Sequence, residues 1–150
     1  VDNGVSWTTI GNQVNGSSRI KHWLIPNSIS GQALVRVSRD GISGQSSDVF
    51  SIIDFPKNIN INNVCECEFS ISWNEVPFAA KYEISVLGEK YMDSIGSTTE
   101  TSYNIPIDNP NDEVWFSVRA ITENGSKGVR AVAEYYDGSG VSNCLLNSNF

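Results

Sequence analysis

The three cysteines of this chain, Cys65, Cys67 and Cys144, are the residues whose chemistry is easiest to anticipate. An odd number allows at most one internal disulfide and leaves one thiol over, and three unpaired, partly buried thiols are the alternative. The cysteines do not predict a zinc site, because one Cys-x-Cys pair and a distant third cysteine lack a fourth ligand. The only histidine, His22, lies far from them in the sequence.

Side chains suited to catalysis are few. His22 is the only imidazole that could complete a catalytic dyad, and because it stands beside Trp23 in an expected strand, we interpret it as an exposed or core-edge residue. Asp108 and Asp112 flank Pro110 without the apolar surroundings that raise the pKa of a catalytic carboxyl group. The sequence contains no glycine-rich phosphate loop and no His-Glu-x-x-His motif. It therefore predicts a chain that is not an enzyme and binds no cofactor.

The loop at 108–113, Asp-Asn-Pro-Asn-Asp-Glu, is rich in the oxygen ligands that calcium prefers. Its spacing differs from that of an EF-hand loop, and Asp and Asn residues around a proline form turns without any metal. The turn is the preferred interpretation, and no metal site is predicted.

The elements that must position these residues are short strands, because apolar residues alternate with polar ones and no helical periodicity occurs. In the second half of the chain, strands are expected at 58–62, 67–74, 82–86, 90–95, 103–107, 114–120 and 128–136. In the first half, they are expected at 5–10, 20–25, 33–38 and 48–52, with a turn at Asp40-Gly41. Ala33, Val35 and Val37 are expected to share one face of the third of these strands.

The composition narrows the classes of partner. The chain has 150 residues and a formal net charge of -7, and an acidic surface argues against nucleic acid and anionic membranes as partners. No stretch approaches the roughly 20 apolar residues of a membrane-spanning helix. The abundance of Ser, Asn, Gly and Thr is typical of extracellular β-proteins.

The chain is expected to hold two β-sandwich segments and a tail. Phe55-Pro56-Lys57 marks the boundary, which gives a first segment at 1–54, a second at 55–137 and a linker or tail at 138–150. The first segment has only about four strands, too few to close two sheets over a core. We expect its missing strands to lie elsewhere in a longer polypeptide or to come from a partner.

The second segment resembles the fibronectin type III family. The resemblance rests on Trp73 in the second expected strand, on Lys81 to Val86 in the third and on Phe116 to Ala120 in the sixth, and it covers roughly 56–136. One residue departs from the family pattern: the tyrosine that often leads the sixth strand is replaced by Val114, and Trp115 is then expected to face outward. The expected architecture is all-β, with two antiparallel sandwiches in tandem.

The first segment resembles the C-terminal part of an immunoglobulin-like module, and Val1 to Trp7 resembles most of an Asp-box, in which the aspartate stabilises a turn. The tandem order and the segment at 88–93 resemble the accessory modules of large proteins that Bacteroidetes export by type IX secretion. This resemblance implies an extracellular or cell-surface location.

The fibronectin type III resemblance also bears on the cysteines. In this fold the turn between the first two strands lies at the same pole as the end of the last strand. A disulfide from Cys65 or Cys67 to Cys144 is therefore expected, worth about 3–5 kcal/mol in the loop-entropy model. The sequence does not choose between the two partners.

Trp115, Tyr135 and Tyr136 are candidates for an exposed patch that binds sugar or protein, unless neighbouring side chains or the adjacent domain cover them. Ser94 lies in an Asp-Ser-Ile triplet that resembles the O-glycosylation motif of the same bacteria, and Asn15 and Asn124 match the N-glycan pattern but also suit turns.

The function expected from these observations is non-catalytic: spacing, adhesion or interaction within a large secreted or cell-surface bacterial protein. The expected partners are neighbouring domains of the same polypeptide and protein or glycan ligands. One alternative is that these are accessory domains of a secreted protease or glycosidase whose catalytic domain lies outside this chain. The other alternative is a carbohydrate-binding module.

Overall fold

The computed structural model describes residues 3–12, 14–25, 29–65 and 67–139, which form two compact units divided between Ile52 and Ile53. The predicted boundary between 54 and 55 lies close to this division. The described residues contain strands and no helix, and therefore no helix long and apolar enough to cross a membrane. The predicted all-β class with antiparallel sheets is confirmed.

Unit 1 contains two separate antiparallel pairs. One pair joins β1 (Ser30–Ala33) to β4 (Phe50–Ile52), and the other joins β2 (Arg36–Arg39) to β3 (Ile42–Gln45). The turn between β2 and β3 has positive φ at both central residues, 50° at Asp40 and 80° at Gly41. These are the dihedrals of a type I′ turn, whose twist suits a two-residue hairpin, so the predicted Asp-Gly turn is confirmed.

The expected strands at 5–10 and 20–25 are wrong, because neither range forms a strand in the structure. Alternation of apolar and polar residues indicates a preference for the extended conformation, but a strand also needs a neighbouring strand with which to form hydrogen bonds. Trp7 instead donates its indole N–H to the Gly4 carbonyl and carries the Arg36 guanidinium 4.0 Å from its ring centre.

The single strand expected at 33–38 is divided into β1 and β2, which pair with different partners. Ala33 is buried, whereas Val37 is 72% exposed, so the prediction that both share one face of a single strand is wrong. The strand expected at 48–52 is present as β4. That unit 1 is part of an immunoglobulin-like sandwich stays a prediction, and Asp2 of the Asp-box resemblance lies outside the described residues.

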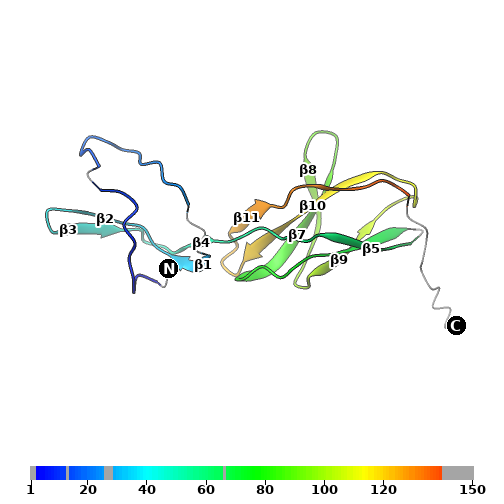
Figure 1. Cartoon of the computed structure of the whole chain (residues 1–150), viewed down its shortest axis with the longest axis horizontal. Helices are drawn as coiled ribbons and strands as arrows, with labels where there is room; N and C mark the ends of the chain where they lie inside the picture. Colours follow the sequence, from blue (N-terminus) through cyan, green and yellow to red (C-terminus); the bar gives the residue numbers. More distant parts are fainter. Residues whose placement is uncertain (1–2, 13, 26–28, 66, 140–150) are drawn as a thin grey trace. The chain divides into compact units, whose positions relative to one another are not determined.

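Unit 2 contains two antiparallel sheets that enclose one core (Figure 1). The smaller sheet has the order β5-β6-β9, and the larger has the order β11-β10-β7-β8, with β12 also paired to β10. The strands are β5 (Asn60–Val64), β6 (Glu68–Ser72), β7 (Ala79–Leu87), β8 (Met92–Thr98), β9 (Ser102–Pro106), β10 (Val114–Thr122), β11 (Lys127–Arg130) and β12 (Glu134–Tyr136).

The core of unit 2 is built from the alternate residues that the sequence predicts. Phe69 and Ile71 of β6 face Phe116 and Val118 of β10, and all four are fully buried. The rings of Phe69 and Phe116 lie 5.4 Å apart in a tilted contact that aromatic side chains favour. The period-two pattern therefore predicts which face of each strand is inside, and the opposite faces are left to carry function.

The strand boundaries differ from those expected in several places. The first strand is shifted toward the C-terminus of the range expected at 58–62, and it forms β5. The return strand expected at 128–136 is divided into β11 and β12, which pair with the two halves of β10. Pro106 ends β9, as a residue without a backbone N–H should.

Candidate interaction surface

The outer face of the larger sheet carries the candidate functional residues of unit 2. Because Phe116 and Val118 of β10 point into the core, Trp115 and Arg119 point outward. The cross-strand partner of Trp115 is Tyr135 on β12, and that of Arg119 is Glu83 on β7. An aromatic pair and a charged cluster therefore lie along the same outer face.

The aromatic pair consists of Trp115 and Tyr135. Their ring centres are 4.7 Å apart with an angle of 31° between the planes, and the residues are 45% and 38% exposed. A hydrogen bond to the Glu113 carboxylate raises the pKa of Tyr135 above its ordinary value of 10.0, and slight desolvation and the charges of Glu113 and Asp137 act in the same direction. The phenol therefore stays protonated at neutral pH.

Tyr136 does not belong to this surface: it is not the exposed candidate, and the alternative that neighbouring side chains cover it is the correct one. It pairs with Val114, whose side chain faces inward, and it is 3% exposed. Its ring stacks on Phe69 at 4.6 Å, and its hydroxyl donates to the Pro110 carbonyl. Adjacent residues of a strand point to opposite sides, so Tyr135 and Tyr136 could not share one surface.

Tyr136 also explains how the fold accommodates Val114. In immunoglobulin-like sandwiches a tyrosine near the start of the sixth strand ties that strand to the preceding loop through its hydroxyl. Here the cross-strand neighbour of Val114 supplies the hydroxyl, and it bonds the loop between β9 and β10.

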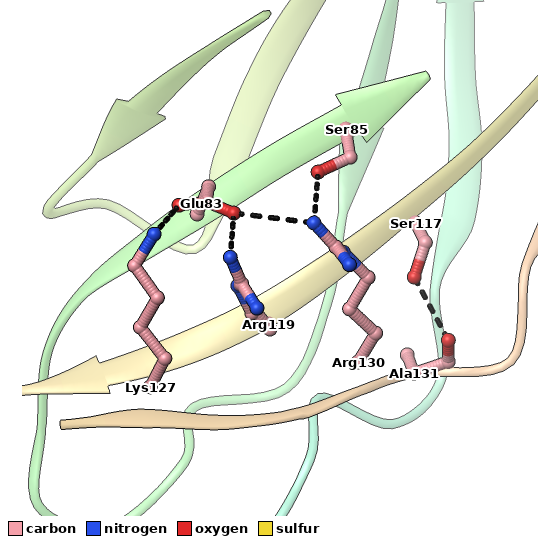
Figure 2. Close-up of polar contacts among 7 residues, drawn as sticks. All are labelled: Glu83, Ser85, Ser117, Arg119, Lys127, Arg130 and Ala131. Carbon is pink, nitrogen blue, oxygen red and sulfur yellow. Dashed lines mark hydrogen bonds and ion pairs between the residues drawn. The ribbon is translucent and has the colours of Figure 1, made fainter. Parts of the chain in front are cut away.

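The charged cluster surrounds Glu83, as Figure 2 shows. The carboxylate of Glu83 lies 2.5 Å from Arg119, 2.7 Å from Lys127 and 3.5 Å from Arg130. Arg130 also donates to the Ser85 hydroxyl at 3.3 Å. These residues come from β7, β10 and β11, and the cluster holds the three strands together across their outer face.

Burial of Glu83 raises its pKa, but hydrogen bonds from Lys127 and Arg119 outweigh this effect, so the pKa lies below its ordinary value of 4.5. A carboxylate that stays ionised at neutral pH and is held by cations is a poor general acid. It is also poorly placed as a nucleophile, because its oxygens are occupied. We therefore assign the cluster to stability rather than chemistry.

The loop at 108–113 forms a turn stabilised by its own side chains. Asp112 accepts a hydrogen bond from the backbone N–H of Asn109, and Asn109 accepts one from that of Asn111. Among the described residues, no three His, Cys, Asp or Glu side chains are arranged to hold a metal ion.

Beside this loop lies an open depression of about 550 Å³. Its lining includes Trp115, the half-exposed Leu87, and the acidic residues Asp108, Asp112 and Glu113. None of the described residues that line it is a lysine or an arginine.

The cysteines of the Cys-x-Cys pair differ in state. Cys65 is disulfide-bonded, whereas Cys67 is an exposed free thiol, so Cys67 is not the disulfide residue of the pair. Both lie in the connection between β5 and β6, where Cys65 donates its backbone N–H to the Glu68 carbonyl. Cys144 lies outside the described residues.

The remaining predicted residues are dispersed over the surface. His22 is exposed and outside any strand, and Ser94 is exposed on β8. Asn15 and Asn124 both accept hydrogen bonds within turns. His22 and Asn15 belong to unit 1, and Ser94 and Asn124 belong to unit 2.

The Glu83 cluster was not predicted from the sequence. A signal for it exists, because Glu83 and Arg119 occupy outward positions on two strands whose inward residues are predicted correctly. The cross-strand register that pairs them could not be read from either strand alone.

Comparison with known proteins gives a fold but no family assignment. No protein-family model matches the chain, and no curated protein matches it significantly. A solved structure described as an FN3tt mutant is similar to 57% of this chain and 96% of its own, with 22% identity and a TM-score of 0.51. The sixth fibronectin type III domain of human fibronectin type III domain containing protein 3 is 20% identical over 67% of this chain and 98% of its own, with a TM-score of 0.49.

The first of these similarities, together with the sheet order of unit 2, defines a β-sandwich module with a fibronectin type III-like fold. The predicted resemblance is confirmed at the level of fold.

Proposed function

We propose that this chain is a non-catalytic spacer and interaction segment of a secreted or cell-surface protein. The observation that carries the proposal is the exposed Trp115–Tyr135 pair on the outer face of a closed sandwich. Exposed aromatic residues that are not needed for the core typically mark contact surfaces. Fibronectin type III-like sandwiches generally act as rigid modules, which suits both spacing and presentation.

Two further observations support this proposal. Cys65 is disulfide-bonded, and stable disulfides are typical of oxidising compartments outside the cytoplasm. Unit 1 leaves large apolar side chains open to solvent, with Leu24 92% exposed and Ile42 79% exposed. Such surfaces suit contact with neighbouring domains of the same polypeptide.

The location is tested with an antibody against unit 2, applied to cells that make the protein before and after lysis. We expect the signal on intact cells or in the medium, and we expect external protease to remove the cell-bound part. A signal that appears only after lysis would refute the extracellular location. The intact mass of the same material tests O-glycosylation at Ser94, and a Ser94→Ala variant serves as the control.

A carbohydrate-binding module is the second candidate, and the aromatic pair is the observation that favours it, because sugars stack on exposed indole and phenol rings. A glycan array with the native chain and Trp115→Ala tests it. Binding that the substitution abolishes would support it, and equal binding by both proteins would remove it.

The origin in a type IX-secreted protein and the accessory role beside a hydrolase are both proposals about the parent polypeptide. They rest on the tandem order of the modules and on the segment at 88–93. The full reading frame distinguishes the parents: a catalytic domain in the same polypeptide favours the hydrolase, and further sandwiches favour an adhesin.

A further inference from the structure

The depression beside the Trp115–Tyr135 pair combines an aromatic wall with negative charge. Asp108, Asp112 and Glu113 line it together with Trp115, and among the described ion pairs none involves these three carboxylates. A surface with this composition attracts cations in two ways. The carboxylates act through charge, and the face of the indole ring acts through its quadrupole.

The aromatic wall is held in place before any ligand arrives. Tyr135 lies against Trp115 from the neighbouring strand, with 4.7 Å between the two ring centres. The backbone on both sides belongs to the paired strands β10 and β12. A preorganised ring loses little conformational entropy on binding, so even a small contact yields measurable affinity.

We propose that this depression binds lysine or arginine side chains of an extended, basic protein segment. The proposal rests on the interaction function proposed above and adds the chemistry of the partner. Charge complementarity favours a basic protein segment over a neutral glycan, because the three carboxylates attract a positively charged side chain, whereas an uncharged sugar gains no such attraction. The half-exposed Leu87 offers an apolar contact for the methylene stem of a lysine.

The test is an NMR titration of the whole, isotope-labelled chain at low and high salt. The probes are a blocked peptide of alternating lysine and glycine, the same peptide with glutamate in place of lysine, and cellohexaose. We expect the lysine peptide to shift the Trp115 indole resonance and the amides of 108–115 saturably. We expect its affinity to fall as salt rises, because exposed charges are screened.

Two matched pairs of variants localise the binding. Trp115→Ala and Glu113→Gln should each weaken binding by roughly two- to fivefold, the size of an exposed cation–π or ionic contact. Phe78→Ala removes an exposed aromatic residue next to the opposite end of β7, and Glu100→Gln changes the net charge equally in the turn between β8 and β9, so neither should alter binding.

Three results would overturn the proposal: no saturable shift with the lysine peptide, equal weakening by Glu100→Gln and Glu113→Gln, or tighter binding of cellohexaose or the glutamate peptide. Each of these leaves the antibody test of location unaffected, so failure of the proposed partner is distinguishable from failure of the proposed function.

Discussion

Replacing Glu83 by glutamine should destabilise unit 2, because the substitution removes the carboxylate that pairs with three cations. The Glu83 side chain is 8% exposed and that of Arg119 is 18% exposed, whereas Lys127 is 52% exposed. A hydrogen bond between buried charged groups contributes about 1.5–3 kcal/mol, and an exposed ion pair contributes about 0.2–1 kcal/mol. Glutamine can still accept one hydrogen bond, so the expected loss is about 2 kcal/mol.

The measurement is urea unfolding of the whole chain, followed through the amide resonances of Ile84 and Val118, which report on unit 2. A slope of about 1 kcal/mol per molar urea for a unit of this size converts the loss into a midpoint shift of about 2 M. Glu100→Gln is the matched control, because it removes an exposed carboxylate from the turn between β8 and β9. Its midpoint should move by less than about 0.5 M.

The pH dependence of the difference between the native chain and Glu83→Gln supplies a second check. The pKa of Glu83 is lowered in the folded state from its ordinary value of 4.5, so its stabilising contribution is fully present above that value. As pH falls below 4.5, the unfolded chain takes up the proton first, and the contribution is lost as pH drops through the folded-state pKa. Other carboxylates act on both proteins and cancel in the difference.

Two outcomes would refute this reasoning. One is a Glu83→Gln midpoint at neutral pH that matches that of the control. The other is a destabilisation that persists unchanged at low pH, which would indicate lost packing rather than lost charge.

Two further predictions concern Tyr136 and the cysteines. Tyr136→Phe should lower the free energy of unfolding by about 1 kcal/mol, because it removes the hydrogen bond to the Pro110 carbonyl. Tyr135→Phe should change the free energy of unfolding by less than about 0.5 kcal/mol. Urea unfolding of the two variants compares these values, and equal effects would contradict the assignment of Tyr136 to the core. Alkylation without reduction should label Cys67 alone, and peptide mapping should then find Cys65 joined to Cys144; a labelled Cys65 would exclude this pairing.

The core of unit 2 could be predicted because the alternation of apolar and polar residues within each strand shows which side chains face inward. Phe69, Ile71, Phe116 and Val118 occupy alternate positions, and a period of two assigns them to one face without knowledge of any partner strand. The same pattern in unit 1 led to wrong strands at 5–10 and 20–25, because extended residues become a strand only where another strand is available to pair.

The candidate surface was predictable only in part. Trp115 faces outward as its position in the alternation requires, but Tyr135 and Tyr136 could be assigned only after the pairing with β10 was known. A shift of that register by one residue would have buried Tyr135 and exposed Tyr136. The Glu83 cluster could not be predicted for the same reason, because its members come from three strands whose register is not known from the sequence.

The amino-acid sequence by itself therefore determined the all-β class, the sandwich in the second half and the inward side chains, because these follow from local alternation and turn chemistry. The tertiary structure alone decided which outward side chains meet. Cross-strand register placed Tyr135 against Trp115 and Arg119 against Glu83, and chain folding placed the acidic loop beside the indole. These contacts join residues that are far apart in the sequence. They depend on how the strands pair, and the sequence of a single strand does not determine that pairing.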